Sequence, residues 1–488
     1  MISTPEGVSL EELLGNRGRR LRRVVLLASL GCVLGLAVFA LFHEFPGRPG
    51  GLAADYRVFY AAGELIGRGA NPYHLRALQA AEQAVNHYPS LNPVLDSFVD
   101  PPIAAWVLVP LTHLPFWVGY GTLSGAGLLL IVLTVTLLAR DLGWRHTTIL
   151  AVSVAVSWIG LLGLIDGQFD AILFAALAGS MLLAWHDRSL AAGLVLGLTL
   201  IKPTVLWPAP IFLFLALWPD RRRAWRFALG FLVTAAAFLG ASRPWLGSWL
   251  HALGSFGAGV GSRQPDLAGL PGLLGAAPRA WGLGTGLTAP ATVTIVALAL
   301  AAMVVFAVWM MVSPDWRRVS PVGRATWAVA LPVGVWLLAI PYAHPNDDLL
   351  LLPLLMLTVG RDARRVHGLG LGLSLTTMVL VLLIWPAQVV PWPLGLLALT
   401  GLAAAVWHWR TDIRLTGFGA GLCVLALATL PPVWSFHLLP VGLTPIAVLV
   451  VVVEGARTCW MEVGGAGTGP AYFEEPPGAG IAQPVTGA

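Results

Sequence analysis

The sequence predicts an all-α polytopic membrane protein, and three observations support this. Only 11% of the 488 residues are charged, whereas a soluble globular protein carries roughly 25%. Mean hydropathy is +0.78. Uncharged apolar runs recur at residues 24–42, 116–139, 287–312 and 368–388, each close to or above the roughly 20 residues that a helix needs to cross a bilayer. A soluble fold this apolar could not cover its surface, so we expect lipid to be the main solvent.

The first helix sets the orientation of the chain. Residues 1–23 hold a basic cluster before an apolar run with no small-residue cleavage site after it, which indicates an uncleaved anchor and a cytoplasmic N-terminus. Helix 24–43 then leads to an outer segment, residues 44–115. We expect interfacial helices there at 59–66 and 75–86, and an apolar stretch at 103–114 that is too short to span and is interfacial or re-entrant.

The rest of the chain alternates apolar spans with loops. Segment 189–218 is too long for one span, and Lys202-Pro203 breaks it into two short helices that meet on the outer side. A glycine-containing outer loop is expected at 243–281. The other spans expected up to residue 360 are helices 116–139, 147–164, 169–185, 228–242, 287–312 and 325–340.

Residues 24–360 are predicted to form the membrane core, and residues 361–460 to add further transmembrane helices, for a total of about 12–14. Residues 461–488 are rich in Gly, Pro and Ala and are predicted to be a disordered cytoplasmic tail.

Charge and cysteine content exclude several function classes. The threading places most of the 29 basic residues in inner loops, as the positive-inside rule predicts. It therefore explains the net charge of +5 without nucleic acid as a partner. Cys32, Cys423 and Cys459 have spacings that fit neither a metal site nor a disulfide framework.

Polar residues from distant parts of the chain share the outer side in this threading. Ionisable groups at membrane depth are costly and are functional-site candidates by default. The set comprises Asp55, Asp100, Asp166, Gln168, Lys202, His344, Asp347 and Asp348.

Two of these residues have competing interpretations. Asp55 is either an N-cap for the helix that follows or a catalytic carboxylate. Lys202 is the only lysine in an arginine-rich chain, so it is hard to assign to positive-inside signalling. It either reaches the outer headgroups or supplies a point charge to a phosphate, and we favour the phosphate.

The remaining candidates are open to simpler interpretations too. Asp166-Gly167-Gln168 is either a capped turn or a place where Gln168 contacts a polar ligand. Asp347 and Asp348 favour a helix N-terminus; they point in different directions, so they make a weak metal site. Arg57 contacts headgroups or helps to hold an anionic lipid carrier.

The motifs together resemble glycosyltransferase family 87, the polyprenol-phosphate-mannose-dependent α-1,2-mannosyltransferases with a GT-C fold. They cover about residues 20 to 360. In chain order they are Asp55-Tyr56 with Phe59-Tyr60-Ala61-Ala62-Gly63, Gly69-Ala70-Asn71-Pro72-Tyr73, Asp100-Pro101-Pro102, Gly167-Gln168, Lys202-Pro203 and Tyr342-Ala343-His344. The chain departs from the family in having Asp100 where Tyr is usual, and in the Asp347-Asp348 pair.

The resemblance implies an inverting transfer of mannose from polyprenyl-phosphate mannose to a hydroxyl of a glycolipid or lipoglycan. Asp55 would take the acceptor proton, with His344 assisting. Lys202, Gln168, Arg57 and Asp166 would contact the donor sugar or phosphate. Tyr56, Asp100, Asp347 and Asp348 are candidates for acceptor contacts.

The same resemblance sets the location and the alternatives. It implies a site on the outer face of a bacterial plasma membrane, with no cofactor or metal required. The abundance of Arg, Ala, Gly and Val suggests a GC-rich genome, compatible with actinobacteria. An arabinofuranosyltransferase that uses decaprenyl-phosphate arabinose is the runner-up.

A lipid-linked sugar transporter or flippase is less favoured, because no inverted repeat pairs with the broken helix at Lys202.

Overall fold

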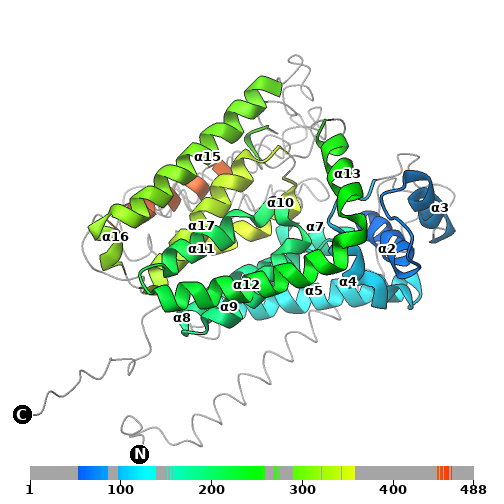
Figure 1. Cartoon of the computed structure of the whole chain (residues 1–488), viewed down its shortest axis with the longest axis horizontal. Coiled ribbons are helices and arrows are strands. Elements are labelled where there is room, and N and C mark those ends of the chain that lie inside the picture. The colour runs from blue at the N-terminus through cyan, green and yellow to red at the C-terminus, as the bar shows by residue number, and fades with distance from the viewer. Residues whose placement is uncertain are drawn as a thin grey trace, which may run out of the picture.

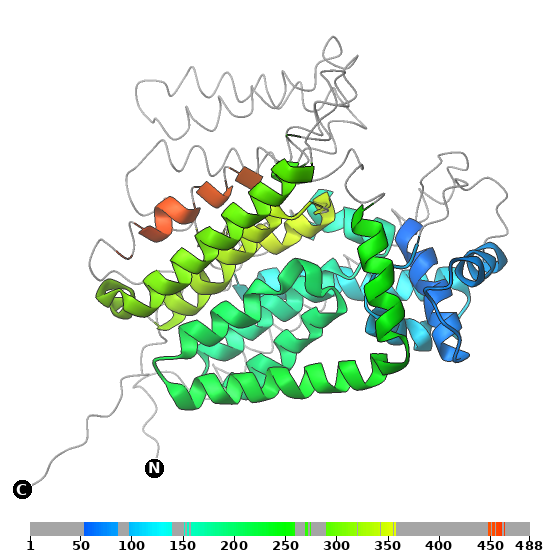
Figure 2. The ribbon, with the colours of Figure 1, turned by 45° about the horizontal axis from the view of Figure 1, so that its top comes forward.

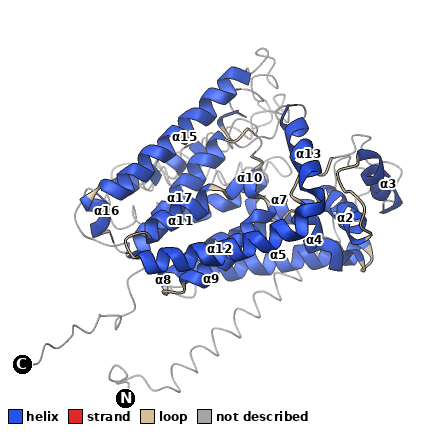
Figure 3. Ribbon diagram, in the orientation of Figure 1, coloured by secondary structure: helices blue, strands red, loops and turns tan. Residues whose placement is uncertain are grey.

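The computed structural model describes residues 53–85, 97–138, 151–258, 269–274, 289–357 and 448–463, with short gaps inside the last four ranges. The predicted first helix at 24–43, most of residues 361–460 and the tail at 461–488 lie outside the described residues. Every regular element in the described part is a helix, without a strand (Figure 3), which agrees with the predicted all-α class.

The first part of the fold is built from α2 (Ala54–Gly67), α3 (Leu75–Val85) and α4 (Pro102–Thr112), which confirms helices within the predicted outer segment. Helix α2 packs against both of the others, and the three lie together at one end of the molecule in Figure 1. Their core is aromatic and includes the fully buried Tyr56 and Phe98. With 11 residues, α4 would be about 17 Å long, which is short of the roughly 30 Å hydrocarbon core.

A larger helical bundle forms the rest of the fold. Figure 2 shows α12 along one side of the bundle and turning sharply into α13. The elements of the bundle are α5 (Phe116–Leu138), α7 (Trp158–Asp166), α8 (Asp170–Trp185), α9 (Ser189–Gly197), η2 (Leu198–Ile201), α10 (Pro203–Leu206), α11 (Pro208–Leu217), α12 (Arg221–Ser242), η3 (Arg243–Trp245), α13 (Leu246–Ala258), α15 (Ala289–Val312), α16 (Pro314–Arg318), α17 (Pro321–Ala339) and η6 (Pro345–Leu351).

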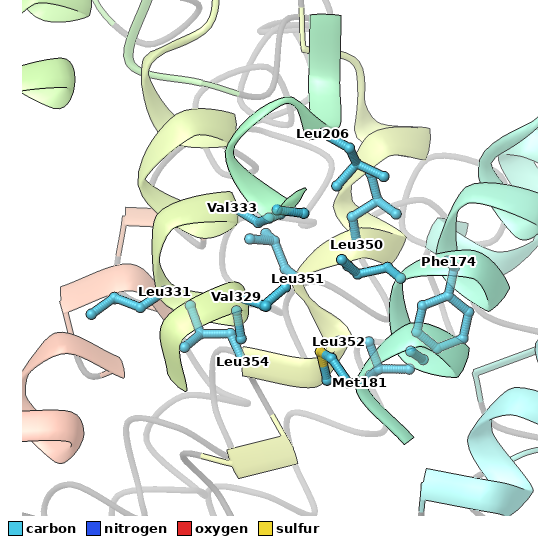
Figure 4. Close-up of a cluster of buried hydrophobic side chains, with 14 of the residues drawn as sticks. Phe174, Met181, Leu206, Val329, Leu331, Val333, Leu350, Leu351, Leu352 and Leu354 are labelled. Atoms are coloured by element: carbon cyan, nitrogen blue, oxygen red, sulfur yellow. The ribbon is translucent and has the colours of Figure 1, made fainter. Parts of the chain in front are cut away.

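Aliphatic side chains hold the bundle together. In Figure 4, leucines of η6 point between α8, which contributes Phe174, and α17, which contributes Val329 and Val333. Burial of each such side chain contributes roughly 1.5–3 kcal/mol. This packing places η6, the element that follows His344, against α7, α8 and α17.

Three described helices are long and apolar enough to cross a membrane: Phe116–Leu138, Arg221–Ser255 and Pro290–Val312. Several others are apolar but shorter, among them α8 and the joined pair α9–η2. The predicted break at Lys202-Pro203 is confirmed, because η2 ends at Ile201 and α10 begins at Pro203.

Two expectations for local structure were wrong, and one of the two interpretations of Asp55 is excluded. Helix α12 begins at Arg221 rather than at residue 228, because Asp220 caps it by accepting a 3.1 Å hydrogen bond from the Arg223 N–H and arginine is a good helix former. The start of the predicted loop 243–281 is helical, as η3 and α13. Asp55 is not an N-cap; that position belongs to Ala53, and Asp55 lies in the first turn of α2.

Candidate active site

Asp55 is held at the start of α2 by the turn that joins α7 to α8. Ala53, just before the helix, has a left-handed backbone (φ 61°) that residues other than glycine rarely adopt. Its N–H donates to the carbonyl of Ile165 at 2.8 Å. The last turn of α7 therefore fixes where α2 begins, and so where the Asp55 carboxylate lies.

Gln168 contacts that carboxylate directly. Its Nε2 donates a hydrogen bond to Asp55 Oδ2 at 2.6 Å, and its backbone N–H donates to the Gly163 carbonyl at 2.7 Å. Gly167 precedes it with φ 76°, and a Cβ built there would lie 2.4 Å from the Tyr56 Cβ. The turn therefore needs glycine both for its backbone conformation and for its close approach to α2.

Lys202 lies between two carboxylates at the break between η2 and α10. Its Nζ is 2.7 Å from Asp347 Oδ1 and 3.5 Å from Asp170 Oδ1. Both carboxylates are 1% exposed, and the lysine side chain is 13% exposed. Charges this deeply buried must be paired, because an isolated one would carry a large desolvation cost.

Further hydrogen bonds hold the two carboxylates in place. Asn346 Nδ2 donates to Asp170 Oδ2 at 2.7 Å, and the His344 backbone N–H donates to Asp347 Oδ2 at 3.0 Å. The four oxygens of Asp170 and Asp347 thus all have partners. The network joins α8, the break at Lys202 and the loop into η6.

Asp100 connects the two halves of the site. It lies in the loop before α4, where its backbone carbonyl accepts a 2.6 Å hydrogen bond from the Tyr73 hydroxyl. Burial raises the pKa of its carboxyl to about 7; the nearby charge of Lys202 lowers this pKa, and those of Asp55, Asp170 and Asp347 raise it. Asp100 is therefore within electrostatic reach both of Asp55 and of the lysine network.

The structure thus brings together most of the residues that the sequence placed on one side. Asp55 and Gln168 touch, Lys202 and Asp347 touch, Asp100 lies near both pairs, and His344 contributes its backbone to the network. Tyr342 lies outside the described residues.

Two other candidates have surroundings that favour a packing role. Tyr56 is fully buried in an aromatic cluster, and Arg57 Nε is 3.3 Å from the buried carboxylate of Glu82 on α3. Asp166 ends α7 and acts electrostatically on Tyr120. Asp348 is 1% exposed, and neither of its carboxylate oxygens has a hydrogen-bond partner among the described residues.

Two residues in the network were not predicted. Asp170 comes four positions after Asp166, where it reads as an ordinary acidic residue in the first turn of a helix. Asn346 lies within the predicted loop but carries no charge to single it out. Asp170 and Asn346 come into contact only because η6 packs against α8. In the described part of the chain, no group of three or more His, Cys, Asp or Glu side chains is arranged to hold a metal ion.

The described part is a helical bundle with three helices long and apolar enough to cross a membrane and a buried cluster of ionisable groups, which is typical of a membrane protein with a functional site. A model of glycosyltransferase family 87 matches residues 98–341, half of the chain. The chain belongs to this family and is a glycosyltransferase. No curated protein and no solved structure matches it. The match includes Asp100, Gln168, Asp170 and Lys202, whereas Asp55 precedes it and His344 follows it.

Proposed function

We propose that this glycosyltransferase moves mannose from polyprenyl-phosphate mannose to a hydroxyl of a glycolipid or lipoglycan, forming an α-1,2 linkage at the outer face of a bacterial plasma membrane. The observation that carries the proposal is the pairing of an oriented carboxylate, Asp55, with a nearby buried cation, Lys202. Asp100 is electrostatically coupled to both.

Asp55 is proposed as the general base. As the acceptor oxygen bonds to the anomeric carbon of mannose, the Asp55 carboxylate takes the hydroxyl proton. The bond from that carbon to the phosphate oxygen breaks, and its electron pair leaves with the polyprenyl phosphate. Attack opposite the leaving phosphate inverts the anomeric configuration and needs a single base. Gln168 would keep the Asp55 carboxylate turned toward the acceptor.

Lys202 is proposed to meet the leaving phosphate. An ammonium group has three N–H donors, and Asp170 and Asp347 account for two of them. No other described residue accepts from the third, which leaves it for a phosphate oxygen, where a fixed positive charge stabilises the negative charge that develops as the bond breaks. His344 and Asp347 would hold this arrangement through the loop into η6.

The short helices support a site that lies below the membrane surface. With 16 residues, α8 is about 24 Å long, against a hydrocarbon core of roughly 30 Å. If its C-terminal end, near Asp187, lies at the inner boundary, Asp170 at the other end is a few ångströms below the outer boundary. A polyprenyl phosphate could then present its headgroup to the site while its chain stays in lipid.

The test is sugar transfer by purified protein with either mannose or arabinose lipid-phosphate donors and a panel of glycolipid acceptors. Asp55→Asn should abolish transfer while the protein still inserts and folds, and full activity in this variant would overturn the base assignment. Asp187→Asn is the matched control, because this aspartate is 78% exposed and pairs with Arg223. Preferential use of the arabinose donor would reject mannose as the substrate.

A further inference from the structure

Helix α13 bonds to the two loops that flank α3, although the sequence predicted only a loop at this place. It follows the sharp turn at the end of α12 (Figure 2). Two residues in its first turn carry the bonds. Asn71 Nδ2 donates to Ser248 Oγ at 3.1 Å, and Trp249 Nε1 donates to the carbonyl of Val99 at 3.0 Å. Helix α13 is therefore tied to the loop before α3 and to the loop before α4.

The loop before α4 is held at three successive residues. Phe98 is 2% exposed, and its ring packs against that of Tyr73 with centroids 5.3 Å apart. The carbonyl of Val99 accepts from Trp249, and the carbonyl of Asp100 accepts from the Tyr73 hydroxyl at 2.6 Å. Two aromatic donors thus fix the backbone on either side of the peptide bond that leads into Asp100.

These two donors are also linked to each other. The Tyr73 backbone N–H donates to Asn71 Oδ1 at 3.0 Å, and the amide of the same Asn71 donates to Ser248, the neighbour of Trp249 in α13. The four hydrogen bonds therefore form a closed circuit through the two loops and the helix. Neither donor can move away from its carbonyl without straining the rest of the circuit.

The restrained loop lies against the candidate active site. Phe98 belongs to the same buried cluster as Ile201, which directly precedes Lys202. Helix α4, which begins two residues after Asp100, packs against η2, which ends at Ile201. In the part of the chain that the structure describes, no hydrogen bond reaches the Asp100 carboxyl, whereas the Asp55 carboxylate has a partner. Its carboxyl oxygens are therefore available to a ligand.

We propose that Tyr73 and Trp249 are positioning residues for sugar transfer, because they hold the Asp100 carboxyl where it accepts a hydrogen bond from a sugar hydroxyl. A carboxyl oxygen can accept such a bond whether or not the group is protonated. The inference rests on the proposed transfer at the site of Asp55 and Lys202, but not on mannose as the sugar. Hydroxyls of the donor sugar and of the acceptor have the same chemistry, so separate KM values for donor and acceptor distinguish them.

The test is a set of double-variant cycles in the purified full chain, with whichever lipid-phosphate donor the wild type uses. Asp100→Ala should raise one of the two KM values roughly tenfold or more, because a hydrogen bond to a charged group is lost. Trp249→Phe and Tyr73→Phe each remove one donor and keep a ring, and should raise the same KM roughly threefold to tenfold. In the Asp100→Ala background neither should raise it further, because residues that act through Asp100 are coupled to it.

Trp106→Phe is the matched control. Trp106 Nε1 donates to the carbonyl of Ala241 at 3.1 Å, so this variant loses the same kind of bond between α4 and the end of α12, away from residues 98–100. It should lower the apparent unfolding temperature about as much as Trp249→Phe and leave both KM values unchanged.

The proposal is wrong if Trp249→Phe raises KM by the same factor with and without the Asp100 carboxyl. It is also wrong if Trp106→Phe raises KM as much, or if Trp249→Phe and Tyr73→Phe leave both KM values at the wild-type level. Failure of the proposed function has a different signature, which is an unchanged kcat in Asp55→Asn.

Discussion

The Gln168 amide donates to the Asp55 carboxylate across 113 residues of sequence, at 2.6 Å. This bond makes Gln168 a positioning residue for the proposed base. We expect Gln168→Ala to lower kcat by roughly ten- to a hundredfold, because a hydrogen bond to a charged group contributes about 1.5–3 kcal/mol. KM for the acceptor should change much less. Steady-state kinetics with purified protein measure kcat and the acceptor KM separately. An unchanged kcat would remove Gln168 from this role.

Lys202 is expected to support stability as well as donor use. Lys202→Ala leaves Asp170 and Asp347 buried beside each other without their cation, which should cost roughly 3–5 kcal/mol. The double variant Lys202→Ala with Asp347→Asn removes part of that repulsion and should recover stability but not activity. Thermal unfolding in detergent and donor kinetics test the two effects separately. If the single variant unfolds like wild type, the ion pairs do not matter for folding.

Asp100 should make stability depend on pH. Its pKa in the folded protein is raised to about 7, above the ordinary value near 4, so its contribution is fully present below pH 4. That contribution is lost as pH rises through 7. Apparent unfolding temperatures should therefore fall between pH 5 and pH 8 more steeply in wild type than in Asp100→Asn. Equal slopes in the two proteins would show that Asp100 does not titrate in this range.

Sidedness can be tested with single cysteines in a background that lacks Cys32, Cys423 and Cys459. Arg68 is 70% exposed and follows the last residue of α2, the helix whose first turn holds Asp55, and Arg222 is exposed in the first turn of α12. Arg68→Cys should react with an impermeant thiol reagent in intact cells, and Arg222→Cys only after the membrane is opened. The reverse pattern would place the Asp55 site on the cytoplasmic side.

The sequence was a good guide to apolar spans and a poor one to contacts. The break at Lys202 could be predicted because proline and a lone charge interrupt an apolar run. The start of α12 could not, because its arginines carry both a topology signal and a high helix propensity. The role of Asp170 depends on η6 folding back against α8, a packing of segments far apart in sequence that no local pattern encodes. The threading placed Asp55 and His344 on the outer side, but the catalytic roles proposed for them came from the family motifs rather than from their local environment.

Gly167 and Gly69 have the same backbone conformation. Alanine variants at these two positions therefore separate the cost of that conformation from the effect of crowding against α2, which holds Asp55. Gly167 has φ 76° and Gly69 has φ 73°, so alanine at either position costs about 1–2 kcal/mol through its left-handed backbone. Only Gly167 is crowded: its new Cβ would meet Tyr56, whereas nothing lies within 4 Å at Gly69. Gly167→Ala must therefore push α2 away from the α7–α8 turn and separate Asp55 from Gln168. We expect transfer activity to fall at least tenfold in Gly167→Ala and less than threefold in Gly69→Ala, at similar expression. Equal losses in both variants would mean that the close approach at Gly167 does not position the base.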